Sequence, residues 1–208
     1  MAEKKDLAKK NKQVDAGNLF AQNYYEEMTF DNILLPELKL AEVEFFKCEF
    51  KSTVLTKANF GSCRFEKCVF TASDLSLISV TDSSFTDVRF LNCKLLGIDW
   101  TKISTPSKMG FNGCKMNDSV FFNMDLRNTE MVNCEARNVD YEKCNMSKSD
   151  LSNSDLLNSA FSGANLSFAN LTGAKNYSID PTQTNIKHAK FSVPEVLALL
   201  AKWEIQVG

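Results

Sequence analysis

The chain has 208 residues with 24 basic and 26 acidic side chains, a formal net charge of −2, and so offers no basic surface of the kind that binds nucleic acid. Its seven cysteines are an odd number without a CxxC pair, and the chain has one histidine, which argues against a secreted disulfide framework and a zinc site. No apolar run approaches the roughly 20 residues that a membrane-spanning helix needs, so no membrane partner is expected.

The N-terminal segment, residues 1–29, begins with a basic and polar stretch. It lacks the apolar run of a secretory signal, and the expected localisation is therefore cytoplasmic. Near its end, Tyr24 and Tyr25, together with Phe30, are expected to begin or to cap the first turn of the region that follows.

A repeat of five residues begins at Leu35. Every fifth residue from there to Trp100 is large and apolar, and a second run does the same from Phe111 to Leu171, with Ala136 as its one small member. Two residues before these centres the side chain is usually small, and all seven cysteines occupy this position. The cysteines therefore act as small core residues in an internally repetitive chain.

A period of five fits neither a helix nor an alternating strand. One large and one small inward residue in every five imply a chain that turns a corner in each repeat, so that four repeats close a square coil of 20 residues. Successive coils would stack as parallel ladders ~4.8 Å apart, with residues twenty apart above one another. The predicted neighbours are Phe45 with Phe65 and Phe85, Phe50 with Phe70 and Phe90, Cys48 with Cys68, and Cys114 with Cys134. These cysteine pairs are close enough to bridge, but are expected to be reduced in a cytoplasmic protein.

The pattern resembles that of the pentapeptide-repeat family, whose loose consensus is small, polar, Leu or Phe, polar, polar. The resemblance covers about residues 30–175 and is clearest in DLSNSDLLNSAFSGANLSFANLTGA, from Asp150 to Ala174. It implies an all-β fold, a right-handed quadrilateral parallel β-helix. The expected plan is a polar N-terminal segment over residues 1–29, the β-helix over 30–175, and a C-terminal connector and helix over 176–208.

The repeat changes phase once, because Trp100 and Phe111 are eleven residues apart. The segment 101–110 between them is rich in Ser, Thr and Lys, and Pro106 cannot donate a ladder hydrogen bond. Two interpretations stay open: a bulge or small corner, or a functional loop with Lys102, Pro106 and Lys108 as candidates. Quinolone-resistance members of the family have functional loops of this kind, but this segment is short and does not match them residue by residue.

Acidic side chains often precede the centres of the second run. The candidate partner-binding carboxylates are Asp125, Glu130, Glu135, Asp140, Asp150 and Asp155. The coil arithmetic stacks Glu130 with Asp150 and Glu135 with Asp155, and such like-charged columns are unfavourable unless a partner uses them. The alternative is that Asp and Asn are favoured at this position by turn chemistry. Other columns are compensated, because Glu44 lies beside Arg64 and Asp74 beside Lys94.

The C-terminal region is predicted to contain a short α-helix. Ser192 with Glu195 three residues later forms a capping-box signature, and Pro194 suits a first turn. The apolar residues of this helix are Val196, Leu197, Leu199, Leu200 and Trp203. They are expected to cover the open end of the β-helix. Gyrase-targeting relatives dimerise through such a helix, so the resemblance also implies a homodimer.

No arrangement in the sequence points to catalysis. His188 has no nucleophile that can be paired with it and is expected on the surface, and no phosphate-binding or dinucleotide motif is present. We therefore expect a non-enzymatic protein without cofactor, metal or small-molecule substrate.

Two functions remain. The family resemblance implies a rod that imitates DNA and binds DNA gyrase or topoisomerase IV, protecting it from quinolone-type inhibitors without contacting nucleic acid itself. However, residues 35–175 hold 16 basic and 17 acidic side chains, a weak charge for a DNA mimic. The alternative is a general protein-interaction scaffold. Its candidate apolar contacts are Phe46, Leu77, Leu96, Phe122, Leu157 and Phe168. One continuous acidic face would favour mimicry, and mixed faces would favour the scaffold.

Overall fold

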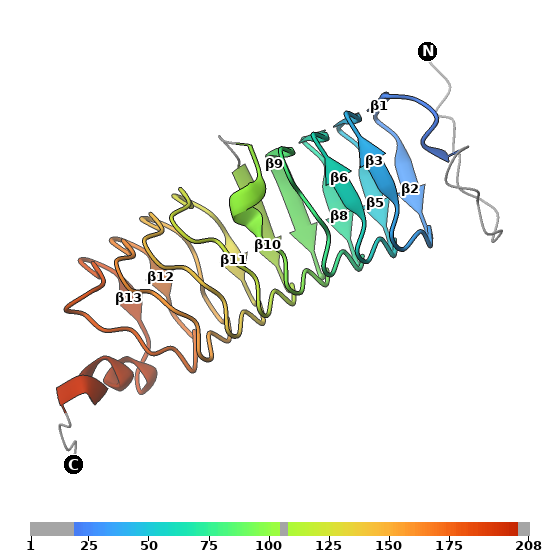
Figure 1. Cartoon of the computed structure of the whole chain (residues 1–208). Coiled ribbons are helices and arrows are strands. Elements are labelled where there is room, and N and C mark those ends of the chain that lie inside the picture. The colour runs from blue at the N-terminus through green and yellow to red at the C-terminus, as the bar shows by residue number, and fades with distance from the viewer. Residues whose placement is uncertain (1–18, 105–107, 204–208) are drawn as a thin grey trace. The chain divides into compact units, whose positions relative to one another are not determined.

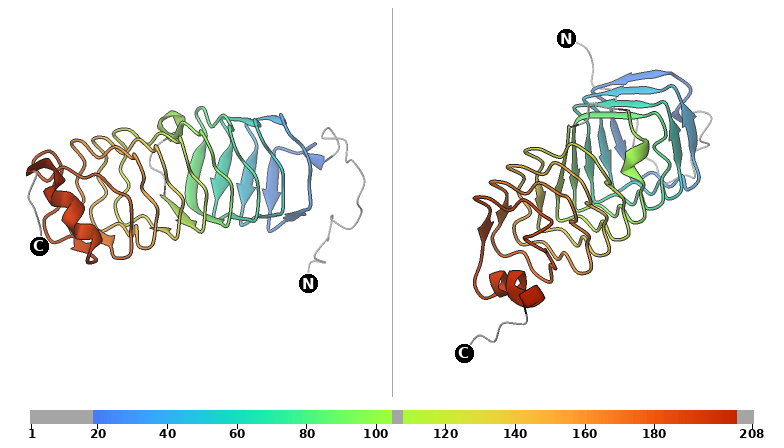
Figure 2. Two further views of the ribbon diagram at one scale, coloured as in Figure 1. Left: turned by 90° about the horizontal axis from the view of Figure 1, so that it is seen from below. Right: turned by 60° about the vertical axis from the view of Figure 1, so that its left-hand side comes forward.

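The computed structural model describes residues 19–104 and 108–203. The chain divides into two compact units, residues 1–110 and 111–208. Within each unit the backbone winds in flat-sided coils that stack one on the next (Figures 1 and 2). The fold is a parallel β-solenoid, as the five-residue repeat predicts.

The strands of the first unit are short and pair in parallel with residues twenty positions away. They are β1 (Tyr24–Glu26), β2 (Thr29–Asp31), β3 (Lys39–Ala41), β4 (Glu44–Phe46), β5 (Glu49–Lys51), β6 (Asn59–Gly61), β7 (Arg64–Glu66), β8 (Val69–Thr71) and β9 (Ser84–Leu91). Strands β1, β4, β7 and the start of β9 form one side, and β2, β5, β8 and the end of β9 form the next. A third side contains β3 and β6, and isolated bridges that join residues 34, 54, 74 and 94 form the fourth.

The second unit is built mainly from isolated parallel bridges, again twenty residues apart. Its elements are the end of β10 (Lys108–Asn112), which begins in the first unit, β11 (Met131–Val132), β12 (Asn170–Leu171), β13 (Lys190–Phe191) and the helix η2 (Glu195–Trp203). Residues 111 and 131 pair in register, as do residues 170 and 190. The twenty-residue coil predicted from the sequence is therefore present in both units.

The predicted inward residues form the core. Phe45, Phe65 and Phe85 are stacked with ring centroids 5.0 Å apart at each step. The neighbouring stack of Phe50, Phe70 and Phe90 has centroid distances of 4.4 and 5.1 Å. All seven cysteines are buried free thiols. Large and small apolar side chains thus alternate along the chain to fill each coil.

Each corner is made by the residue two positions after a centre, which adopts a positive φ in nearly every repeat. Lys47, for example, has a φ of 51° and Asn138 a φ of 55°. Asn, Asp, Lys and Ser hold most of these positions, and Leu77 and Phe168 are large apolar exceptions. Since bulky residues are rarely found in this region, the two exceptions need a local explanation.

The coils extend beyond the expected limits of residues 30 and 175. At the N-terminal end Tyr25 is buried and stacks on Phe45, and Phe20 contacts both rings. At the other end the N–H of Phe168 donates to the carbonyl of Lys187, so the pairing continues. The centres are irregular there, and for this reason the five-residue pattern did not reveal that coil.

The C-terminal helix differs from the predicted α-helix. Segment η2 is a 3₁₀ helix from Glu195 to Trp203, and the Leu197 N–H donates to the carbonyl of Pro194 three residues earlier. The Ser192 hydroxyl accepts a hydrogen bond from the Gly173 N–H at 2.6 Å. The predicted capping residue is thereby used to join the segment to the neighbouring coil.

The phase change is confined to a short stretch. Trp100 begins the 3₁₀ helix η1 (Trp100–Lys102), is buried, and packs edge-on against Phe85 and Phe90. The Ser104 N–H still donates to the Ser83 carbonyl, so the coil remains paired up to that residue. The residues between Ser104 and Lys108, including Pro106, lie outside those that the structure describes.

Candidate protein-interaction surface

The predicted acidic columns are present in the second unit. Glu130 bridges to Asp150, and Glu135 bridges to Asp155, one coil apart. The six candidate carboxylates nevertheless differ in exposure and in hydrogen-bond and ion-pair partners, and they do not form one acidic face.

The four aspartates of this set stabilise turns. In each, a carboxylate oxygen accepts a hydrogen bond from the backbone N–H two residues later. The donors are Arg127 for Asp125, Glu142 for Asp140, Ser152 for Asp150 and Leu157 for Asp155. Asn145, Asn165, Asn170 and Asn185 make the same contact at equivalent positions. This is Asx-turn chemistry, the alternative explanation that the sequence left open.

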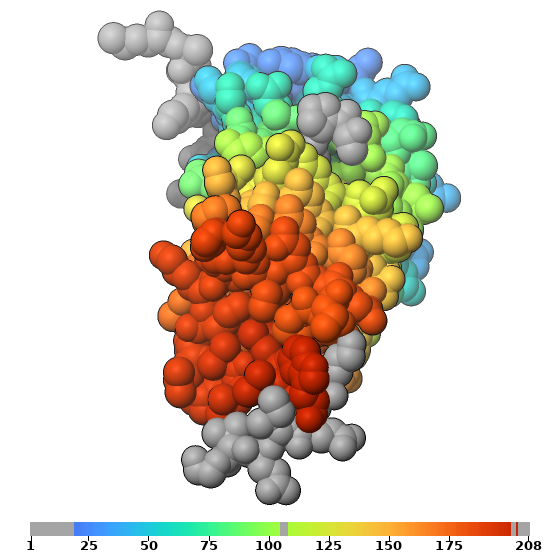
Figure 3. All heavy atoms as spheres, turned by 90° about the vertical axis from the view of Figure 1, so that its left-hand side faces the viewer, coloured from blue at the N-terminus to red at the C-terminus, as the bar shows by residue number. Residues whose placement is uncertain are grey.

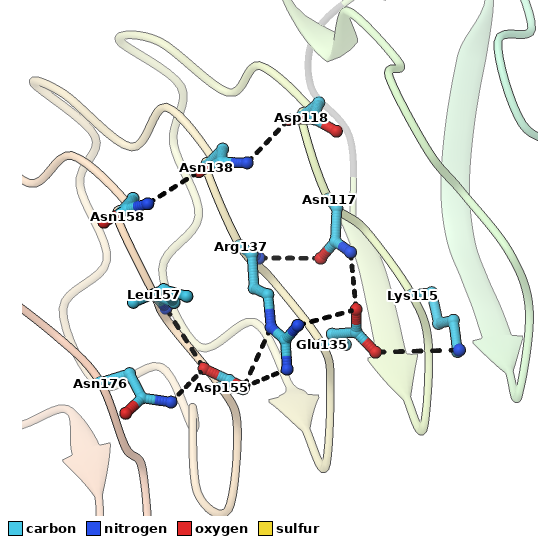
Figure 4. Close-up of polar contacts among 10 residues, drawn as sticks. All are labelled: Lys115, Asn117, Asp118, Glu135, Arg137, Asn138, Asp155, Leu157, Asn158 and Asn176. Atoms are coloured by element: carbon cyan, nitrogen blue, oxygen red, sulfur yellow. Dashed lines mark hydrogen bonds and ion pairs between the residues drawn. The ribbon is translucent and has the colours of Figure 1, made fainter.

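Arg137 neutralises the column of Glu135 and Asp155 (Figure 4). Its Nη2 atom lies 2.8 Å from Asp155 Oδ2, and its Nη1 atom lies 3.8 Å from Glu135 Oε1. Lys115 approaches the other oxygen of Glu135 at 3.8 Å, and the Asn117 amide donates to Glu135 at 2.7 Å. The charges of both acids are therefore compensated within the protein.

Asp155 is not on the surface, contrary to its expected place on an acidic face. Only 6% of the residue is exposed, and the Asn176 amide donates to it at 2.8 Å in addition to Arg137. Burial by itself raises the pKa of this carboxyl, but the hydrogen bonds from Asn176 and Arg137 outweigh it and hold the pKa below its usual range. Asp155 thus serves to join coils.

Among the six candidates, Glu130 is the most available. It is exposed, and its carboxylate has no hydrogen-bond or ion-pair partner among the described residues. Asp125 forms a two-point ion pair with Arg127, with a closest distance of 2.6 Å. The Asn170 side-chain amide donates to both carboxylate oxygens of Asp150, at 3.1 Å each. Asp140 is half-buried and makes its turn contact without an ion pair in the described structure.

The described residues of the phase-change segment are tied to the first unit. Lys102 lies 3.6 Å from Asp99. Lys108 Nζ lies 2.9 Å from Asp87, and its hydrogen bond and charge lower the pKa of that carboxyl. Both lysines are exposed and could still meet a partner.

The apolar residues of η2 are unequally covered. Leu199 is 8% exposed, whereas Leu197 and Trp203 are 41% and 47% exposed. Val196 and Leu200 are half-buried. In the space-filling view of Figure 3 the C-terminal segments cover the end of the second unit that faces the viewer. Covering this end therefore leaves part of the helix's apolar surface exposed.

The Cys144 thiol has the chemistry of a buried core residue. Burial raises the pKa of the Cys144 thiol to about 12, and a neutral thiol is a poor nucleophile. Over residues 19–104 and 108–203, no group of three His, Cys, Asp or Glu side chains is placed to hold a metal ion. None of the helices within those ranges is long and apolar enough to cross a membrane.

One surface feature was not recognised from the sequence. Phe168, at a corner, stacks on His188 with ring centroids 4.7 Å apart. His188 is exposed as predicted, but its stacking with Phe168 is not predicted from the sequence, because the expected repeat ends at about residue 175. The twenty-residue spacing between the two was the available signal.

Comparisons with known proteins agree with this geometry. A family model described as "Pentapeptide repeat region" matches residues 43–109, and one described as "Pentapeptide repeats (8 copies)" matches residues 142–175. A comparison with curated protein sequences found no match.

Solved structures of QnrB1, described as a plasmid-mediated fluoroquinolone resistance protein, are similar to this chain. A trypsin-treated variant has a TM-score of 0.56 at 14% identity, covering 89% of this chain and 99% of QnrB1. The full-length form has a TM-score of 0.54 at 16% identity, covering 88% and 100%. HetL from the cyanobacterium Nostoc sp. covers 80% of this chain and 86% of its own at 14% identity, with a TM-score of 0.33. At these identities the similarity to QnrB1 establishes the fold.

Proposed function

This chain is a pentapeptide-repeat protein, and we propose that it acts without catalysis by binding a type II topoisomerase, DNA gyrase or topoisomerase IV, and protecting it from quinolone-type inhibitors. The observation that carries the proposal is the coverage of the structural similarity, because almost the whole of QnrB1 aligns with almost the whole of this chain. The packed core supports a role that depends on the outer surface.

The local charges limit how such binding would work. A DNA-mimicking rod needs carboxylates that are free to meet basic groups of the enzyme. Of the candidate acids, Glu130 meets this condition best, followed by Asp140, and Asp155 does not. The topoisomerase contact would therefore use a few acidic side chains rather than a continuous acidic column.

A gyrase supercoiling assay with a quinolone present, titrated with purified protein, tests the proposal. We expect the protein to restore supercoiling or, alone, to inhibit the enzyme. A double variant, Glu130→Gln and Asp140→Asn, should weaken either effect, because it removes the two available charges while asparagine preserves the turn contact of Asp140. A matched control is Glu37→Gln with Glu42→Gln, which removes exposed charges from the first unit. Absence of any effect at micromolar concentration would contradict the proposal.

The second candidate is a general protein-interaction scaffold with a different partner. It is favoured by the mixed charge of the surface, since Arg137, Arg127 and Lys115 all pair with candidate acids. In either case we propose that the protein forms a homodimer through η2, where Leu197 and Trp203 expose apolar surface.

A further inference from the structure

The second unit has an exposed aromatic residue at a position where the backbone disfavours one. Phe168 has a φ of 60° and is 56% exposed. Asn128 and Lys148 occupy the same corner in the two preceding coils, at φ of 57° and 60°. The positive φ is common to the corners of this fold and Leu77 also adopts it, so what distinguishes Phe168 is its exposed aromatic ring.

The ring of Phe168 is held in place by its neighbour. His188, at the same corner of the next coil, stacks on it with an interplanar angle of 30°. The Phe168 N–H also donates to the Lys187 carbonyl at 2.9 Å, which fixes the two coils together. The aromatic surface is therefore pre-organised, so little conformational entropy is lost when a partner packs against it.

Three lysines lie near this aromatic pair in the sequence or by coil register. Lys187 precedes His188, Lys190 pairs in register with Asn170, and Lys148 lies one coil before Phe168. All three lysines are exposed, and none forms an ion pair with a described residue. We call the surface formed by Lys148, Phe168, Lys187, His188 and Lys190 the cationic corner.

The acids near this corner are already engaged. Asp150, which precedes Asn170 by one coil, accepts hydrogen bonds from the Asn170 amide and the Ser152 N–H. Asp125, on the side that carries Asn145 and Asn165, pairs with Arg127. Asp150 keeps its charge, because its hydrogen-bond donors are neutral, but it forms no ion pair with the three lysines.

We propose that the cationic corner docks a short acidic peptide segment of a partner protein, with one apolar side chain packed on Phe168. Complementary charge would steer and orient the segment, and the aromatic ring would supply the buried anchor. This surface is distinct from the acidic residues assigned to the topoisomerase contact and does not depend on that assignment.

A peptide suits this surface better than a nucleic acid. Residues 111–200 carry ten acidic and eight basic side chains, so a long polyanion would meet repulsion away from the corner. Single-stranded nucleic acids are bound by successive stacking residues along a basic groove. Phe168 and His188 stack on each other and so offer a single aromatic platform.

Fluorescence anisotropy with a labelled peptide of glutamates flanking one phenylalanine tests the proposal. We expect salt-dependent binding by the full chain. Phe168→Asn and the double variant Lys187→Gln, Lys190→Gln should each weaken it about tenfold, the loss typical of an interface anchor. Asparagine suits a corner with positive φ, as at Asn128, and circular dichroism would verify folding. The control Lys175→Gln removes an exposed lysine at another position and should leave affinity unchanged.

Three results would overturn the proposal. They are no binding of the peptide, an equal loss of affinity in the Lys175→Gln control, and binding of an oligo-dT strand at least as tightly as the peptide. The supercoiling assay is a separate readout, and the Phe168→Asn variant should behave there as the unchanged protein does.

Discussion

The residue before each centre has a structural task that accounts for its chemistry. Aspartate and asparagine both reach the backbone N–H two residues later, as Asp150 and Asn170 show. Glutamate is one methylene longer, and Glu130 and Glu135 make no such contact among the described hydrogen bonds. Replacing such an Asp by Asn should therefore remove a negative charge from the surface while keeping the hydrogen bond to the backbone N–H two residues later. Replacing it by Ala removes that hydrogen bond, which is worth about 1 kcal/mol.

Gly173 lies at a corner where the preceding coil leaves little room for a Cβ. Its φ is 72°, and a Cβ there would contact the side chain of Asn153 in the preceding coil. We expect Gly173→Ala to lower the free energy of unfolding by about 1–2 kcal/mol, the strain of a left-handed alanine. Gly61→Ala is the matched control, because its added Cβ would meet only Asn59 Oδ1 at 3.6 Å. Urea unfolding of both variants checks this, and equal stability would contradict the assigned strain.

Arg137 should stabilise the second unit through Asp155. Replacement by glutamine leaves a buried carboxylate with fewer donors, and we expect a measurable loss of stability at neutral pH, because a buried acceptor that loses a donor is destabilising. Lys143→Gln is the control, since Lys143 is exposed and contacts the Phe122 ring rather than an acid. Similar losses in the two variants would argue against the ion pair.

The same site predicts a pH dependence. The pKa of Asp155 is lowered in the folded chain, so its contribution to stability is present above the unfolded pKa of about 4 and is lost as the pH falls through the folded value. The Asp155→Asn variant should therefore lose less stability between neutral and strongly acidic pH than the unchanged protein. Urea unfolding at several pH values measures this difference.

At the scale of the coil, stacked columns of identical side chains define the register. Phe65 lies between Phe45 and Phe85 in one column and is 1% exposed. We expect Phe65→Ala to cost about 3–5 kcal/mol, as for other buried phenylalanines. Phe46, which follows Phe45 in the chain, points outward beside Lys47 and Lys67, and Phe46→Ala should cost less than about 1 kcal/mol. Thermal unfolding followed by circular dichroism separates the two, and equal losses would contradict the stacked core.

The columns also explain how much could be predicted from the sequence. A centre every five residues determines which side chains point inward, so Phe45 above Phe65 and Glu44 beside Arg64 were correctly placed. The contacts that long side chains make across neighbouring coils could not be predicted from the repeat. Arg137 bridges diagonally to Asp155, eighteen residues away, and this contact depends on rotamers rather than on the repeat. The coil beyond residue 175 is not predicted because its first two centre positions hold Asn176 and Pro181 instead of large apolar residues, although the inward residues Ile179 and Thr184 keep the spacing.

At the scale of the whole molecule, the near-neutral charge and the exposed apolar surface of η2 bear on association. A net charge of −2 gives little electrostatic repulsion between copies. Leu197 and Trp203 leave apolar surface uncovered, while Leu199 on the same helix is buried. Since exposed apolar surface of this kind is usually buried in an interface, η2 is the segment through which we expect a second copy of the chain to bind.

Sedimentation velocity tests the proposed homodimer. We expect the unchanged protein to sediment as a dimer at micromolar concentration and the Leu197→Glu variant as a monomer, because a buried unpaired carboxylate costs several kcal/mol at an interface. The control Leu157→Glu introduces the same charge at a residue that is 40% exposed but lies outside the helix, and it should remain dimeric. A monomeric unchanged protein would contradict the homodimer, and dissociation of both variants would place the interface elsewhere.

A monomer obtained in this way also separates the two functions of the helix. If η2 covers the last coil independently of dimerisation, the Leu197→Glu monomer should keep the unfolding temperature of the control, whereas Leu199→Ala should lower it by removing buried surface.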